Sequence, residues 1–81
     1  MMGNLFFELY TREKCPLCDK AKEILEEFSK ETGIHYREID IYSDDQLIEQ
    51  FGLMIPVLKW KEEIIQYGRI EKGAMYKLIE K

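Results

Sequence analysis

The sequence predicts one α/β domain over residues 1–81, with the element order β-α-β-α-β-β-α and a four-stranded mixed sheet flanked by helices. Two observations predict this fold class. Short runs rich in strand-forming residues alternate with segments whose apolar residues recur at helical spacing. The first strand, helix and second strand have the length that favours parallel pairing, whereas two later runs joined by a tight connection favour an antiparallel hairpin.

The parallel unit occupies the first half of the chain. Residues 5–10 are apolar on both faces, as in a strand that is covered on both sides. A helix is predicted from Pro16 to about residue 31, with Gly33 as its stop, because charged residues surround an apolar stripe. Residues 35–41 predict the second strand, and His35 at its beginning is expected on the surface.

The pattern Ser-Asp-Asp-Gln at residues 43–46 is a capping box. It predicts a short second helix that starts at Ser43 and ends at Gly52. Asp44 and Asp45 suit the positive end of that helix. We assign them no chemistry, because no third hard ligand is spaced to join them in a metal site.

Two strands and a helix complete the prediction. Residues 57–61 and 63–67 read as an antiparallel hairpin, and the type of its turn near Glu62 stays open because the turn lacks Gly or Asn. Trp60 in this hairpin is expected to pack on the sheet or in the core. Residues 71–80 carry apolar residues at helical spacing and predict the last helix.

Composition limits the classes of function. The net charge is −4, and the 35% of charged residues mix both signs without forming a basic face. This pattern gives no reason to expect nucleic acid or an anionic membrane as the main partner. No run approaches membrane-spanning length, and the first residues lack the pattern of a secretory signal, so we expect a cytoplasmic protein. We also expect a monomer with a modest core.

Cys15 and Cys18 are the only cysteines and stand at the predicted junction of the first strand and the first helix. Pro16 suits the first helical position, which leaves Cys15 as the N-cap. The sulfur of Cys15 then faces the free helix amides, which favour the thiolate, and Arg12 and Lys14 add positive charge nearby. The pattern predicts Cys15 as nucleophile and Cys18, less exposed and one turn later, as resolving thiol.

A metal site and inert packing are the competing interpretations of the cysteine pair. Structural zinc requires four ligands, and the sequence offers only His35 as a further nitrogen donor. A cysteine followed by proline at a helix start is an unusual way to fill a core. In a reducing cytoplasm, catalysis explains a lone cysteine pair better than a structural disulfide does. The spacing therefore favours redox chemistry.

Three segments resemble a known family: Cys-Pro-Leu-Cys at 15–18, Glu-Ile-Asp-Ile at 38–41, and residues 47–58. By these segments the chain resembles the glutaredoxin and thioredoxin superfamily over nearly its whole length, most closely the small bacterial glutaredoxin-like proteins. The resemblance implies the thioredoxin fold and a cis peptide bond before Pro56, beside the nucleophilic sulfur. It also implies that the backbone N–H and C=O of Ile55 pair with the substrate, as strand addition does.

The departures from the family bear on the substrate. Thioredoxins usually have a buried acid where this chain has Leu9, and glutaredoxins commonly have an aromatic residue where it has Leu17. The resemblance to glutaredoxins implies that Arg12 holds a glutathione carboxylate, in place of the family's Lys. Of the family's double glycine only Gly68 remains, and Arg69 after it is a different anchor for a carboxylate. We therefore predict weak dependence on glutathione.

The resulting prediction is a thiol–disulfide oxidoreductase in which Cys15 attacks and Cys18 resolves, with Pro16 and Leu17 at the substrate-binding surface. No bound cofactor or metal is expected. The expected partners are a disulfide-containing protein or a small thiol such as glutathione, the latter as co-substrate, and a donor of the thioredoxin reductase type. Two classes stay open: a soft-metal carrier or a dimer sharing an iron–sulfur cluster through Cys15, and an adaptor without turnover.

Overall fold

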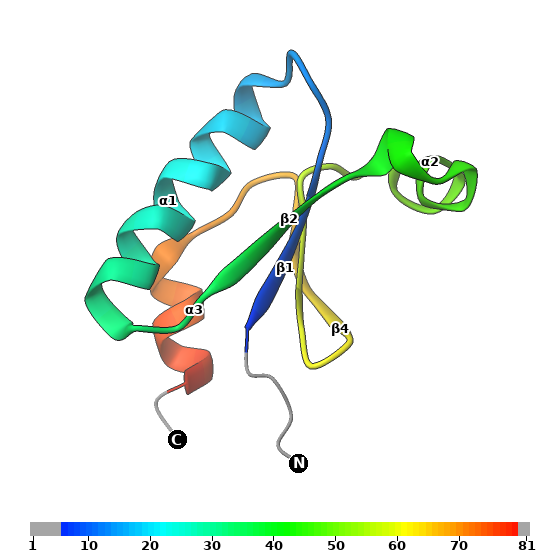
Figure 1. The fold of residues 1–81 in the computed structure, drawn as a ribbon. Coiled ribbons are helices and arrows are strands. Elements are labelled where there is room, and N and C mark those ends of the chain that lie inside the picture. The colour runs from blue at the N-terminus through cyan, green and yellow to red at the C-terminus, as the bar shows by residue number, and fades with distance from the viewer. Residues whose placement is uncertain (1–5, 80–81) are drawn as a thin grey trace.

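A four-stranded sheet forms the centre of the computed structural model, which describes residues 6–79, with three helices around it (Figure 1). The strand order is β2-β1-β3-β4. The elements are β1 (Phe7–Thr11), α1 (Pro16–Thr32), β2 (Tyr36–Asp40), the 3-10 turn η1 (Ile41–Ser43), α2 (Asp45–Phe51), β3 (Val57–Trp60), β4 (Glu63–Tyr67) and α3 (Lys72–Ile79). This order confirms the predicted sequence of strands and helices.

The sheet is mixed, as predicted. Strand β1 pairs in parallel with β2, and it pairs antiparallel with β3, where Tyr10 lies opposite Val57. Strands β3 and β4 form the antiparallel hairpin. Its turn, Lys61-Glu62, has φ values of 53° and 69°, which is the geometry of a type I′ turn built without glycine or asparagine.

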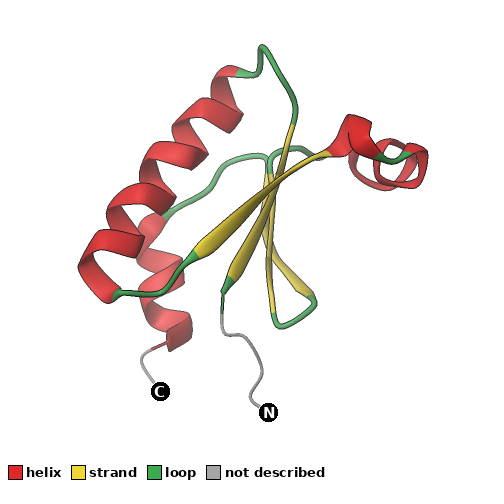
Figure 2. Cartoon of the chain, in the orientation of Figure 1, coloured by secondary structure: helices red, strands yellow, loops and turns green. Residues whose placement is uncertain are grey.

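Helices α1 and α3 cover one face of the sheet, and α2 covers part of the other (Figure 2). On the α1 side, Phe7 stacks edge-on against Phe28 at 5.4 Å between ring centroids, and Trp60 lies 4.5 Å from Phe7. Trp60 therefore packs on the core as expected. On the α2 side, Tyr10 packs against Phe51 at 4.9 Å. The two faces thus have separate apolar clusters.

Helix α1 begins and ends where the sequence indicates. Pro16 is its first residue, and Gly33 caps its end with a φ of 80°, a left-handed conformation that favours glycine. His35 is exposed at the start of β2, as predicted. The predictions for Leu5 in the first strand and Glu80 in the last helix lie outside the described residues.

The predicted start of the second helix at Ser43 is wrong by two residues. Asp44 is the N-cap of α2, because its carboxylate accepts from the Gln46 amide at 2.9 Å. Ser43 belongs to η1, and its hydroxyl donates to the carbonyl of Asp40. The side chain of Asp40 accepts from the Tyr42 amide, so a second acidic residue caps η1 and moves the start of α2 along the chain.

Candidate active site

The predicted site residues converge on one end of the sheet. Because Tyr10 pairs with Val57 and Val57 pairs with Tyr67, the end of β1, the start of β3 and the end of β4 lie side by side. The loops that leave these strands carry Arg12, the Ile55-Pro56 pair and the Gly68-Arg69 pair, in that order. These three loops lie toward the upper end of the sheet in Figure 1, the end at which α1 begins.

Cys15 is the N-cap of α1, as the sequence predicts. Its backbone is extended, with φ −121° and ψ 104°, and its sulfur accepts a hydrogen bond from the Cys18 amide at 3.2 Å. Pro16 occupies the first helical position and has no N–H to leave unpaired. Cys15 is 8% exposed, whereas Cys18 is fully buried.

Cys18 lies beneath Cys15 and is fully buried. Burial, and after it a hydrogen bond with Cys15, raise the pKa of the Cys18 thiol to about 12. The backbone amide of Arg12, which hydrogen-bonds to the Cys18 sulfur, and the Arg12 charge act in the opposite direction. Cys18 is less exposed than Cys15, as predicted. Because its pKa is raised, the Cys18 thiol stays protonated near neutral pH.

The Ile55-Pro56 peptide bond is cis, as predicted. The Ile55 amide donates to the carbonyl of Phe51 at 3.1 Å. Within residues 6–79 no backbone amide donates to the Ile55 carbonyl. Of the two Ile55 groups that the resemblance implies for substrate pairing, the carbonyl is therefore the one left open.

Gly68 holds the proline loop in place. Its amide lies 3.0 Å from the Met54 carbonyl and 2.8 Å from the Pro56 carbonyl, and its φ is 79°. A glycine suits this left-handed conformation, since side chains rarely adopt it. Arg69 next to it is exposed. The roles of Gly68 and Arg69 in substrate binding stay predictions.

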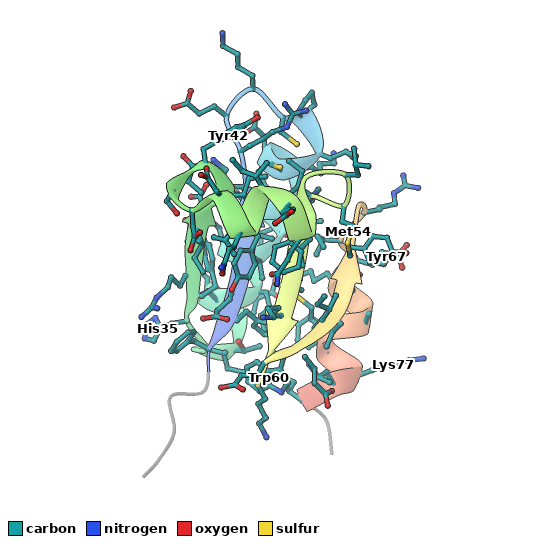
Figure 3. All side chains as sticks on the ribbon, turned by 90° about the vertical axis from the view of Figure 1, so that its right-hand side faces the viewer. His35, Tyr42, Met54, Trp60, Tyr67 and Lys77 are labelled. Carbon is teal, nitrogen blue, oxygen red and sulfur yellow. The ribbon has the colours of Figure 1, made fainter. Side chains whose placement is uncertain are left out.

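Most of the strongly exposed apolar side chains were not singled out by the sequence patterns. In Figure 3, Tyr42 lies toward the end of the molecule where α1 begins, whereas His35 and Trp60 lie toward the opposite end. The large apolar residues on this side of the sheet that are more than half exposed are Leu17, Tyr42, Leu53 and Tyr67. Only Leu17 had been predicted as a surface residue.

Two hollows meet at Arg12. The larger, of about 670 Å³, lies between η1, α2 and the proline loop and is lined by Arg12, Tyr42, Leu53 and Met54, among others. The smaller, of about 230 Å³, lies between the ends of β1 and β2 and has polar walls. Arg12 thus lines the larger hollow, where its side chain can contact a ligand. Its backbone amide contacts Cys18.

Within the range 6–79, no three or more His, Cys, Asp and Glu side chains are grouped so that they could hold a metal ion. Nor is any helix in this range long and apolar enough to cross a membrane.

Comparisons with known proteins agree with this geometry. A family model described as "Glutaredoxin-like domain (DUF836)" matches residues 7–80. A protein named "Probable Thioredoxin" from Archaeoglobus fulgidus is 28% identical over 80 residues, which is 95% of this chain and 88% of that protein. One named "Thioredoxin" from Methanocaldococcus jannaschii is 26% identical, covering 99% and 98% of the two chains.

Solved structures show the same architecture. A structural genomics target from X. campestris has a TM-score of 0.72 and 25% identity, covering 91% of this chain and 95% of that one. A mutant thioredoxin from Halobacterium salinarum has a TM-score of 0.68 and 20% identity over 96% of this chain and 74% of that one. The fold is therefore the thioredoxin fold, with two free cysteines close together at its active-site end. By the match over residues 7–80, the chain belongs to the glutaredoxin-like domain family of the glutaredoxin and thioredoxin superfamily.

Proposed function

We propose that this protein is a thiol–disulfide oxidoreductase that uses Cys15 as nucleophile and Cys18 as resolving thiol. The observation that carries the proposal is the close placement of the two cysteines at the start of α1. The Cys15 sulfur receives the Cys18 amide at 3.2 Å, which stabilises negative charge on it. The Cys18 thiol lies buried one turn later, within reach of a disulfide formed at Cys15.

The reaction proceeds in two exchanges. The Cys15 thiolate attacks a substrate disulfide, forms a mixed disulfide and releases the first substrate thiolate, which takes up a proton. Cys18 then loses its proton and attacks the Cys15 sulfur. The Cys15–Cys18 bond forms, the mixed disulfide breaks, and the second substrate thiolate leaves. Two electrons pass from the dithiol to the substrate.

A disulfide in an exposed segment of another protein is the substrate that the surface favours. Leu17 lies between the two cysteines, Tyr42 and Leu53 line the hollow that Arg12 also borders, and all three are exposed and suit contact with a second chain. The carbonyl of Ile55 supplies an acceptor for a backbone amide of that chain. The amide of Gly68 is bonded within the proline loop, so glutathione lacks one backbone contact that the resemblance would imply.

Reduction of insulin disulfides tests the reaction, with dithiothreitol as electron donor. We expect multiple turnovers for the wild-type protein and none for Cys15→Ser. Cys18→Ser that is reduced, freed of dithiothreitol and then mixed with insulin should retain the first exchange and accumulate a mixed disulfide that mass spectrometry detects. Normal turnover by Cys15→Ser would contradict the assignment of the nucleophile.

The electron donor is tested separately. Glutathione with glutathione reductase, and a thioredoxin reductase with its reduced nicotinamide cofactor, are compared at equal protein concentration. We expect weak, poorly saturable turnover with glutathione. Efficient saturable turnover with glutathione that falls in Arg12→Ala would show that the glutathione site is intact and would contradict the expected weak dependence on glutathione. No turnover with any donor would favour an adaptor role.

A further inference from the structure

A polar cluster lies beneath the active site on the α1 side of the sheet. Thr11, the last residue of β1, is 2% exposed, and its hydroxyl donates to a carboxylate oxygen of Glu38 at 3.0 Å. The ammonium of Lys22 on α1 lies 3.2 Å from the same oxygen. The carboxylate of Glu38, which Thr11 orients, thus gives the partly exposed Lys22 ammonium a partner on the sheet.

This fixed ammonium stands on the side of α1 that carries Cys18. Lys22 follows Cys18 by four residues, and side chains at this spacing are neighbours on one helix face, about 5–6 Å apart at Cβ. Arg12, directly after Thr11, directs its backbone amide at the Cys18 sulfur. The end of β1 therefore contacts two groups. The backbone amide of Arg12 contacts the buried thiol of Cys18, and the hydroxyl of Thr11 contacts the carboxylate of Glu38.

We propose, resting on the oxidoreductase function above, that Lys22 is a positioning residue that stabilises the thiolate of Cys18 during the resolving exchange. Glu38 and Thr11 keep its ammonium near the sulfur. In that exchange the Cys18 thiol loses its proton to solvent hydroxide, the thiolate attacks the Cys15 sulfur, and the substrate thiolate leaves and is protonated. The substrate disulfide is the oxidant, so the electrons balance.

The need for such a charge follows from the burial of Cys18, which raises the pKa of its thiol to about 12 and leaves few thiolates near neutral pH. The interaction between the two groups appears in the pKa of Lys22 and not among the causes that shift the pKa of Cys18. The pKa of Lys22 is raised, first by its hydrogen bond with Glu38 and, among smaller causes, by Cys18. Lys22 therefore stays an ammonium over the pH range in which the enzyme works.

Other charges near Cys18 do not replace this role. Arg12 and Cys15 act on it directly, and Asp19 lies 3.8 Å from Lys22. The small hollow of about 230 Å³ is lined by Thr11, Arg12, Glu13, Lys22, Glu38 and Asp40. Glu38 on β2 and Asp19 on α1 both oppose the effect of Lys22. Lys22 is the cation of α1 that lies one turn after Cys18 on the same face of the helix.

The two exchanges can be timed separately with 5,5′-dithiobis(2-nitrobenzoate), a small coloured disulfide. Attack by Cys15 releases one equivalent of thionitrobenzoate, and resolution by Cys18 releases the second. In Lys22→Gln we expect an unchanged first phase and a second phase about three- to tenfold slower, the size expected for one nearby charge that solvent partly screens. The pH profile of the second phase should shift to higher pH.

Matched variants keep the test specific. Lys20→Gln removes an equal charge from the exposed side of α1 and should leave the second phase unchanged. Lys22→Arg should restore it. In a Glu38→Gln background, where Lys22 is no longer held, Lys22→Gln should slow the second phase less than twofold. Thermal unfolding of each variant reports on any loss of structure.

The outcomes separate this inference from the proposed function. Equal second-phase rates and pH profiles in wild type and Lys22→Gln, with two equivalents released, would overturn the role of Lys22 alone. An effect of the same size in the Glu38→Gln background would overturn the positioning by Glu38. A wild-type protein that releases only one equivalent would overturn both the resolving role of Cys18 and the role of Lys22.

Discussion

The two faces of the sheet are built differently. The α1 and α3 face has a cluster of eight buried residues, among them Phe7, Phe28 and Met75, with further residues packed around it. The α2 face has a cluster of four, namely Tyr10, Ile41, Phe51 and Val57, and the hollow of about 670 Å³ borders it. We call the α1 and α3 face the thick face and the α2 face the thin face. Cys18 is buried on the thick face at the start of α1, whereas Tyr42 and Leu53 are exposed on the thin face. We infer that the thick face positions the reactive cysteines and that the thin face contacts the protein partner.

The thick face should carry more of the stability. Phe28→Ala removes a fully buried ring that touches Phe7 and Tyr76, and should lower the free energy of unfolding by about 3–5 kcal/mol. Phe51→Ala should cost about 2–3 kcal/mol, because short α2 can collapse toward the gap. Urea denaturation followed by circular dichroism measures both. Equal losses would contradict the contrast between the two faces.

The predictable parts of this molecule are local in sequence. Cys15 as N-cap, Pro16 at the first helical position and the stop at Gly33 each depend on neighbouring residues, so spacing was enough. The cis bond before Pro56 came from the family resemblance instead. The start of α2 was missed because Asp40, Ser43 and Asp44 can each cap a helix, and only two of them do so, at the starts of η1 and α2. Each of the three side chains can accept a hydrogen bond from a nearby backbone amide, so the sequence does not select between them.

Contacts set by strand register were beyond sequence reasoning. The hydroxyl of Thr11 and the carboxylate of Glu38 are 27 residues apart, and only the parallel pairing of β1 with β2 brings them together. Leu53 follows the end of α2 at Gly52 and is fully exposed, and the helical pattern that marks buried apolar residues does not extend to it.

Alkaline pH should lower the free energy of unfolding through the Cys18 thiol, which lies on the thick face. The folded protein keeps the Cys18 thiol protonated up to a pKa of about 12, whereas an unfolded thiol loses its proton near pH 8.5. The unfolded state therefore binds fewer protons between these values, and stability that is complete below about pH 8.5 falls as the pH rises. One proton limits the slope to about 1.4 kcal/mol per pH unit.

This pH effect can be assigned to one face. Burial also raises the pKa of Tyr10 on the α2 side, but an unfolded tyrosine titrates only near pH 10. Between pH 8.5 and 10, the fall in the free energy of unfolding should be larger in the reduced wild-type protein than in Cys18→Ala. Parallel curves for the two proteins in urea titrations would show that Cys18 does not keep its proton on folding.

The smallest expected effect on stability, and the most specific effect on function, concerns Leu53. Because its side chain is fully exposed, Leu53→Asp should change the free energy of unfolding by less than about 0.5 kcal/mol. If the thin face meets the partner, the new charge disfavours an apolar contact, and kcat/KM should fall about three- to tenfold for insulin and by less for 5,5′-dithiobis(2-nitrobenzoate). Ile64→Asp is the matched control, since Ile64 is also exposed but lies in β4 near the hairpin turn. Equal losses of insulin reduction in Leu53→Asp and Ile64→Asp would mean that general surface charge, and not the α2 face, governs the encounter.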